Sequence, residues 1–139
     1  MDKKDGGNSE EGDYSTGEQH YDQLSKLLNL QEKFSPLSHI QKHELVKGNA
    51  CHTFNTWLDD NPASLISLAI LDFDIYKPTK AVLSRVVERF TKGSVLVFDE
   101  FSCPHYPGET LALMETLGIN NLHLRRDPHQ PWCSYAVWE

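Results

Sequence analysis

The stretch Leu65-Ile-Ser-Leu-Ala-Ile-Leu-Asp-Phe-Asp-Ile-Tyr-Lys-Pro-Thr-Lys80 decides the fold, because its apolar run ends abruptly in two acidic residues. A second stretch, Lys92-Gly-Ser-Val-Leu-Val-Phe-Asp-Glu-Phe101, repeats the pattern. Apolar runs without polar alternation are typical of strands that are buried on both faces. Between the two runs, apolar residues recur at helical spacing from Thr79 to Phe90. We therefore predict a parallel strand–helix–strand unit.

The acidic residues that end these two runs should meet at one edge of the sheet. Ligands of open parallel sheets bind in the crevice outside the carboxyl ends of the strands. Acidic groups that repel one another persist most easily around a cation, and Mg²⁺ prefers oxygen ligands. The predicted metal ligands are Asp72, Asp74, Asp99 and Glu100. A structural interpretation stays open, since an acidic residue after a strand can also cap a helix or lie in water.

The composition is typical of a soluble globular protein with more acidic than basic residues. The 139 residues suffice for one hydrophobic core. A formal net charge of −7 argues against binding to a phosphate backbone. No apolar run reaches the length of a membrane span, and the first residues lack an apolar leader, so we expect no membrane partner and a cytoplasmic location. Three widely spaced cysteines indicate no disulfide framework.

The rest of the chain divides into an arm and a folded domain. Residues 1–17 are rich in glycine, serine and acid, which predicts a flexible arm, and residues 18–139 form the predicted domain. Local patterns predict further elements along this domain. These are helices over residues 18–34, 49–58 and 109–117, a short strand over residues 43–48, and an antiparallel strand pair over residues 121–125 and 132–138.

Three motifs resemble those of a known family. Leu71-Asp-Phe-Asp-Ile-Tyr-Lys-Pro-Thr-Lys80, Lys92-Gly-Ser-Val-Leu-Val-Phe-Asp-Glu100 and Pro107-Gly-Glu-Thr110 resemble signatures of the macrocin O-methyltransferase family. These class I S-adenosylmethionine-dependent enzymes methylate sugar hydroxyls of natural products with the help of Mg²⁺. The resemblance implies a partial, Rossmann-like α/β sheet in three layers that ends in an antiparallel strand pair. The family's strand order is 3-2-1-4-5-7-6.

The resemblance also implies roles for single residues. S-adenosylmethionine and Mg²⁺ would be the cofactors, and a small-molecule acceptor such as a sugar would be the partner. Glu100 stands where the family more often has Asp or Asn, which changes the reach of that ligand. Two histidines, His105 and His52, are candidate general bases, and for each of them a solvent-exposed or structurally hydrogen-bonded imidazole is the competing interpretation. The implied residues are Asn49, Ala50 and Asp72 near the methyl donor, Asp72 or Asp74 with Asp99 and Glu100 around the metal, His105 and His52 as candidate general bases, and Tyr76 beside the substrate.

One family feature is missing from the sequence, and this absence leaves alternatives open. No glycine-rich turn follows a strand, so the usual phosphate- or donor-binding turn of this fold is absent. We expect a truncated chain, with self-association through an exposed sheet edge, although a partner chain or a rearranged sheet could also close the gap. A catalytically inactive remnant that acts in dimerisation is the main alternative. Metal-dependent glycosyltransferases also use an Asp-x-Asp pattern, and a phosphatase is the weakest alternative.

Overall fold

The computed structural model describes residues 2–7 and 16–139, which fall into two compact units. The larger unit contains residues 2–7 and 49–139, and the smaller one contains residues 16–48. Part of the predicted flexible arm, residues 1 and 8–15, lies outside the described residues. In the described ranges, no helix combines the length and the apolar character that crossing a bilayer requires.

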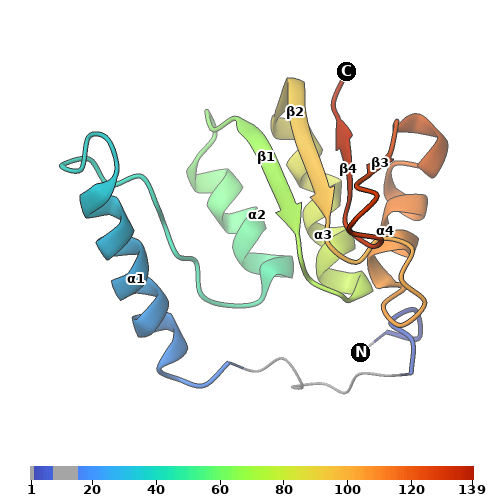
Figure 1. Cartoon of the computed structure of the whole chain (residues 1–139), viewed down its shortest axis with the longest axis horizontal. Helices are drawn as coiled ribbons and strands as arrows, with labels where there is room; N and C mark the ends of the chain where they lie inside the picture. The colour runs from blue at the N-terminus through green and yellow to red at the C-terminus, as the bar shows by residue number, and fades with distance from the viewer. Residues whose placement is uncertain (1, 8–15) are drawn as a thin grey trace. The chain divides into compact units, whose positions relative to one another are not determined.

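The larger unit is a four-stranded sheet with helices (Figure 1). Its strands lie in the order β1-β2-β4-β3, with β1 parallel to β2 and the other neighbours antiparallel. This confirms the predicted strand–helix–strand unit and an antiparallel pair at the end of the domain, and it matches the 4-5-7-6 end of the strand order that the resemblance implies. The first strand of that pair was predicted over residues 121–125, but it is confined to Arg125–Arg126, because residues 119–121 form a 3₁₀ turn. The elements are α2 (Ala50–Asp60), β1 (Ile66–Leu71), α3 (Tyr76–Val86), the 3₁₀ turn η1 (Val87–Arg89), β2 (Phe90–Phe98), α4 (Gly108–Thr116), the 3₁₀ turn η2 (Ile119–Asn121), β3 (Arg125–Arg126) and β4 (Ser134–Val137).

The hydrophobic core lies on one face of this sheet. Alternate strand residues such as Leu71 and Phe98 point to the same face and pack with Leu83 of α3 and Leu113 of α4. Ala50 and Phe54 bring α2 against the same cluster. In Figure 1 the three helices lie behind the sheet.

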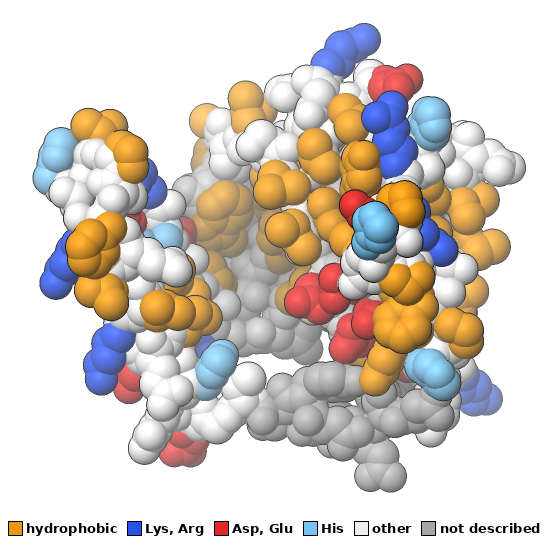
Figure 2. Space-filling model, in the orientation of Figure 1, with side chains coloured by type: hydrophobic (Ala, Val, Ile, Leu, Met, Phe, Trp, Pro, Cys, Tyr) orange, Lys and Arg blue, Asp and Glu red, His pale blue; other side chains and the backbone are white. Residues whose placement is uncertain are grey.

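The opposite face of the sheet is open within this unit. Leu68 and Ile70 of β1 are 54% and 62% exposed, and their neighbours Val95 and Val97 on β2 are only half-buried. Hydrophobic side chains cover this face in Figure 2. The interpretation that β1 is buried on both faces was therefore wrong, since an unbroken apolar run does not reveal which of its faces has a partner. A third layer, which the resemblance implies, would cover this face.

Residues 2–7 of the predicted arm are part of the larger unit and make defined contacts within it. Asp5 is only 2% exposed, and its Oδ1 accepts a hydrogen bond from the backbone N–H of Tyr76, at 2.6 Å. A carboxylate at this place supplies the N-terminal cap that Ile75, the residue before α3, does not provide with its own side chain. No local sequence pattern predicts this contact, because 71 positions separate its partners.

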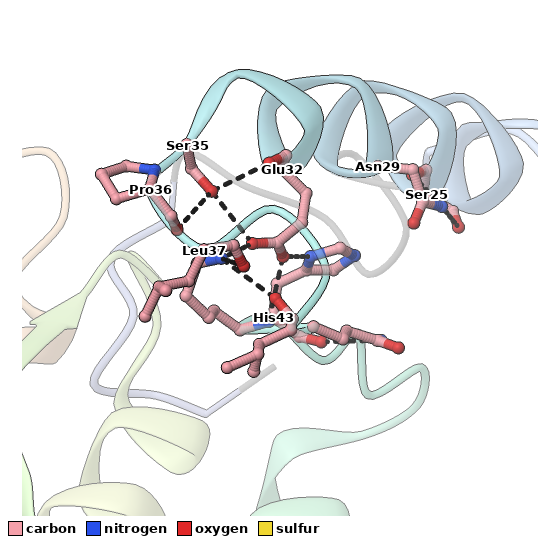
Figure 3. A network of polar contacts seen from close by, with 10 residues as sticks. Ser25, Asn29, Glu32, Ser35, Pro36, Leu37 and His43 are labelled. Carbon is pink, nitrogen blue, oxygen red and sulfur yellow. Dashed lines mark hydrogen bonds and ion pairs between the residues drawn. The ribbon is translucent and has the colours of Figure 1, made fainter.

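The smaller unit consists of α1 (His20–Phe34) and the chain that folds back after it. Glu32 anchors this reversal: its carboxylate accepts the backbone N–H of Lys42 at 3.0 Å and contacts His43 Nδ1 at 2.7 Å (Figure 3). Hydrogen bonds from Lys42 are the main reason why the pKa of Glu32 falls to about 2. All side chains of α1 are exposed or half-buried within this unit.

The strand predicted over residues 43–48 is not formed. These residues run without helix or ladder pairing in the structure, and Gly48 adopts a positive φ of 138°. A strand is stable only when a neighbouring strand satisfies its backbone groups. No described strand pairs with this segment, so the local pattern alone was insufficient.

A candidate acidic site at the carboxyl edge of the sheet

Two turns form the candidate site, and each follows one strand of the parallel pair. The first turn carries Asp72 and Asp74 after β1, and the second carries Asp99 and Glu100 after β2. The strands run parallel in register, so both turns lie at the same edge of the sheet. The Asp99 N–H donates to the carbonyl of Leu71 at 3.2 Å, which joins the two turns directly.

The first turn has an unusual backbone conformation. Asp74 adopts a φ of 59°, in the left-handed region that most residues with a side chain avoid. Aspartate is among the few residues that enter this region, because its short polar side chain can bond locally. The same conformation recurs in the second turn, where Ser102 has a φ of 60°. Both turns therefore hold strained backbone beside the acidic side chains.

The four carboxylates lie within electrostatic reach of one another. The pKa of Asp74 is raised, mainly by burial and further by the charges of Asp72, Glu100 and Asp99. Among the described residues, Glu100 Oε2 is buried and has no hydrogen-bond partner. In the same described ranges, no three His, Cys, Asp or Glu side chains stand close enough to form a complete metal-binding group. The edge thus concentrates negative charge without neutralising it.

A fifth acidic residue, Glu109, lies beneath the two turns, and sequence reasoning gave it no role. Its side chain is fully buried. Oε1 accepts the N–H groups of Phe73 at 3.2 Å and Asp74 at 3.4 Å, while Oε2 accepts the N–H of Glu100 at 3.3 Å. Burial raises the pKa of Glu109 to about 7, although these three backbone bonds act in the opposite direction. In the sequence, Glu109 stood within Pro107-Gly-Glu-Thr110, the third motif of the family resemblance, as an acidic residue in the first turn of a helix.

The start of α4 approaches the first turn very closely. A Cβ atom on Gly108 would lie 2.5 Å from the backbone nitrogen of Tyr76 and 2.8 Å from the carbonyl oxygen of Asp74. Only glycine permits this approach, because backbone atoms cannot give way as the end of a side chain can. In the next position, Thr110 Oγ1 accepts the N–H of Ser102 at 2.8 Å. The first turn of α4 therefore bonds to both acidic turns.

The residues predicted near the methyl donor lie at the start of α2. Asn49 caps this helix, since its Oδ1 accepts the N–H of Cys51 at 3.0 Å, and Ala50 packs against the core. His52 follows in the first turn and is exposed. Figure 1 shows that α2 starts at the end of the sheet where β1 finishes. Asn49, Ala50 and His52 therefore lie at the N-terminal end of α2, at the same end of the sheet as the turn after β1.

The other two predicted residues lie on the α3 and α4 side. His105 is exposed in the loop after β2. Tyr76 is 7% exposed, and its hydroxyl donates to Glu115 at 2.5 Å and accepts from Lys80 at 2.7 Å and Lys4 at 3.1 Å. These three charged partners occupy the hydroxyl, so the role of Tyr76 beside a substrate stays a prediction.

Solved structures that are similar to this chain include two of CalS11. The crystal structure of CalS11, a calicheamicin methyltransferase, matches with a TM-score of 0.90 and 34% sequence identity over 96% of this chain and 52% of its own. The apo structure of CalS11, described as a TDP-rhamnose 3'-O-methyltransferase of calicheamicin biosynthesis, matches with a TM-score of 0.85 and 34% identity over 90% of this chain and 55% of its own. The chain spans about half the length of these structures. No known family profile and no curated protein matches the sequence. The described α/β unit therefore has part of a methyltransferase fold.

Proposed function

We propose that this chain takes part in S-adenosylmethionine-dependent O-methylation of a sugar hydroxyl. The observation that carries the proposal is the meeting of four carboxylates at the carboxyl edge of a sheet whose fold matches CalS11. CalS11 is described as acting on TDP-rhamnose, so a nucleotide-linked sugar is the acceptor class that we would test first. S-adenosylmethionine is the donor that the sequence resemblance implies.

The acidic edge also supports a role for Mg²⁺. This ion usually binds proteins through one or two carboxylates and keeps several waters, so it does not need a complete group of three protein ligands. The unpartnered Glu100 Oε2 and the raised pKa of Asp74 both indicate carboxyl groups that a cation would stabilise. One or two of the carboxylates of Asp72, Asp74, Asp99 and Glu100 would hold the ion, and water would complete its coordination. When bound, Mg²⁺ would act as a Lewis acid that lowers the pKa of the acceptor hydroxyl.

The remaining side chains would orient the reactants and move the proton. His105 and His52 are exposed, and either imidazole would accept the proton of the acceptor hydroxyl at a ring nitrogen. Asn49 and Ala50 would contact the donor, with the Asn49 amide nitrogen as hydrogen-bond donor because its oxygen caps α2. Tyr76 would contribute its ring edge to the acceptor side. Holding both reactants in line supplies much of the rate in such transfers.

Replacing Asp99 with asparagine should abolish most of the transfer. Loss of one carboxylate from a cation site that stabilises the transition state by several kcal/mol should slow the reaction about 100-fold or more. The measurement follows a labelled methyl group from S-adenosylmethionine to TDP-rhamnose, with Mg²⁺ and with EDTA. The matched control is Asp60→Asn, which neutralises an exposed acid at the far end of α2. Equal transfer by Asp99→Asn, or transfer that EDTA does not reduce, would contradict the metal role.

Self-association is a second candidate function, and the open side of β1 favours it. In the described sheet β1 is an edge strand that pairs with β2 alone, and Leu68 and Ile70 expose apolar surface beside that edge. An open edge with apolar neighbours is a template for pairing with another chain. A dimer of this kind would also suit a chain that no longer catalyses methyl transfer.

Replacing Ile70 with lysine should weaken such a dimer about tenfold or more, because a charge at the centre of an apolar contact costs at least 1 to 2 kcal/mol. Sedimentation velocity over a concentration series measures the effect. Met114→Lys serves as the control, since Met114 is similarly exposed but lies on α4. If the native chain stays monomeric throughout the series, self-association through β1 is ruled out.

A further inference from the structure

The buried carboxylate of Glu109 has a place in the fold that packing alone does not explain. Burying a carboxylate costs free energy unless hydrogen bonds compensate for the lost water. The bonds that Glu109 accepts come from Phe73, Asp74 and Glu100, and from no residue of its own helix in the described structure. Each of its oxygens serves a different turn. The carboxylate therefore joins two segments that are otherwise linked by the strand ladder and the bond from Asp99 to Leu71.

We propose that Glu109 is a positioning residue that holds the two acidic turns at a fixed separation, so that carboxylates from both can share one cation. This inference rests on the proposed function, because it concerns the same edge. Glu109 itself would not be a ligand of the cation, because both of its oxygens already accept backbone N–H groups of the turns. Residues of this kind, which orient the ligands of a metal from behind, typically change metal affinity 10- to 100-fold when they are replaced.

The packing of α4 supports this role independently of any hydrogen bond to Glu109. Gly108 allows the helix to start directly against the backbone of Asp74 and Tyr76, which brings the next residue, Glu109, under both turns. Thr110 then fixes the end of the second turn through Ser102. Three consecutive residues of α4 thus contact the two turns, and the strained φ of Asp74 is maintained where these contacts converge.

A glutamine at position 109 separates positioning from simple packing. Glutamine has nearly the same volume as glutamate, but it has only one acceptor oxygen. Its NH₂ group would therefore face a backbone N–H of one turn, and two donors cannot form a hydrogen bond with each other. One turn would lose its anchor while the helix keeps its shape. A purely structural role for Glu109 would predict a general loss of stability and no selective change at the turns.

The experiment compares the native chain with Glu109→Gln, Glu109→Asp and the control Glu115→Gln, an acid of the same helix that bonds to Tyr76 and the lysines instead. Calorimetric titration with Mg²⁺ alone measures affinity, and amide hydrogen exchange measures opening of the turns. We expect Glu109→Gln and Glu109→Asp to bind Mg²⁺ 10- to 100-fold more weakly. Glu109→Asp, with its shorter side chain, should exchange faster at Phe73, Asp74 and Glu100, and Glu109→Gln should exchange faster only at the turn that loses its acceptor oxygen. The amide of Leu96, in the core strand β2, should exchange as in the native chain.

Each outcome bears on one claim. Unchanged exchange at the two turns in both Glu109 variants would overturn the positioning role, whatever the metal affinity. Faster exchange that extends equally to Leu96 would also overturn it, because the effect would then be global unfolding. If the native chain binds no Mg²⁺ while the turns still open selectively, the metal part of the proposed function fails and Glu109 remains the anchor of the two turns.

Discussion

Replacing Gly108 with alanine should lower the free energy of unfolding by about 3 kcal/mol, at the upper end of what overpacking usually costs. The added Cβ would meet the backbone nitrogen of Tyr76 at 2.5 Å and the carbonyl oxygen of Asp74 at 2.8 Å. Neither atom can move without displacing the first acidic turn or the start of α3. Urea unfolding followed by circular dichroism measures the change.

The control for this substitution is Gly7→Ala. An added Cβ at Gly7 meets nothing within 4 Å, so the change should stay within about 0.5 kcal/mol. A loss below about 1 kcal/mol for Gly108→Ala would show that α4 can withdraw from the turn at little cost. The close approach would then not be what places Glu109 beneath the acidic edge.

The stability of the protein should also depend on pH through Glu109. Its pKa rises from 4.5 to about 7 in the folded chain, so the folded state favours the protonated form. The stabilising effect is complete below the unfolded pKa of about 4.5 and is lost as the pH rises through about 7. The shift corresponds to about 3 kcal/mol, because one pKa unit equals about 1.4 kcal/mol.

The Glu109→Gln variant isolates this contribution. Between pH 4.5 and 8, the native chain should lose about 3 kcal/mol more stability than the variant, which cannot ionise at this position. Glu115 and Glu32, whose pKa values are lowered to about 2 by their lysine partners, titrate at lower pH and are shared by both proteins. If the two proteins instead lose the same free energy of unfolding as the pH rises, then ionising the buried Glu109 costs nothing, which would contradict this prediction.

Local patterns in the sequence were sufficient for the elements that pair with close neighbours. The β1–α3–β2 unit and the antiparallel β3–β4 pair were predicted from periodicity and turn residues, and the structure confirms both. The placement of the four acidic residues in two turns at one edge of the sheet followed from the parallel strands alone, and their role as metal ligands stays a prediction. The strand over residues 43–48 was wrong, because a strand depends on a neighbour that no local pattern reveals.

The features that escaped prediction depend on contacts between distant residues. Glu109 bonds to Phe73 across 36 positions, and Asp5 bonds to Tyr76 across 71. Both are acids whose side chains look solvent-exposed by residue type, yet each is buried against backbone N–H groups. The exposed face around Leu68 and Ile70 has the same cause, since burial of a strand is set by what packs on it. The roles assigned to His105, His52, Tyr76, Asn49 and Ala50 stay predictions.

We propose that the carboxylates after β1 and β2 form a cation site that serves methyl transfer. Calorimetric titration of the purified chain with Mg²⁺, alongside Asp99→Asn, tests this site without the need for a substrate. We expect one site for the native chain and an affinity at least about tenfold lower for Asp99→Asn, equivalent to about 1.4 kcal/mol. Equal affinity in the two proteins, or no binding by the native chain, would contradict it.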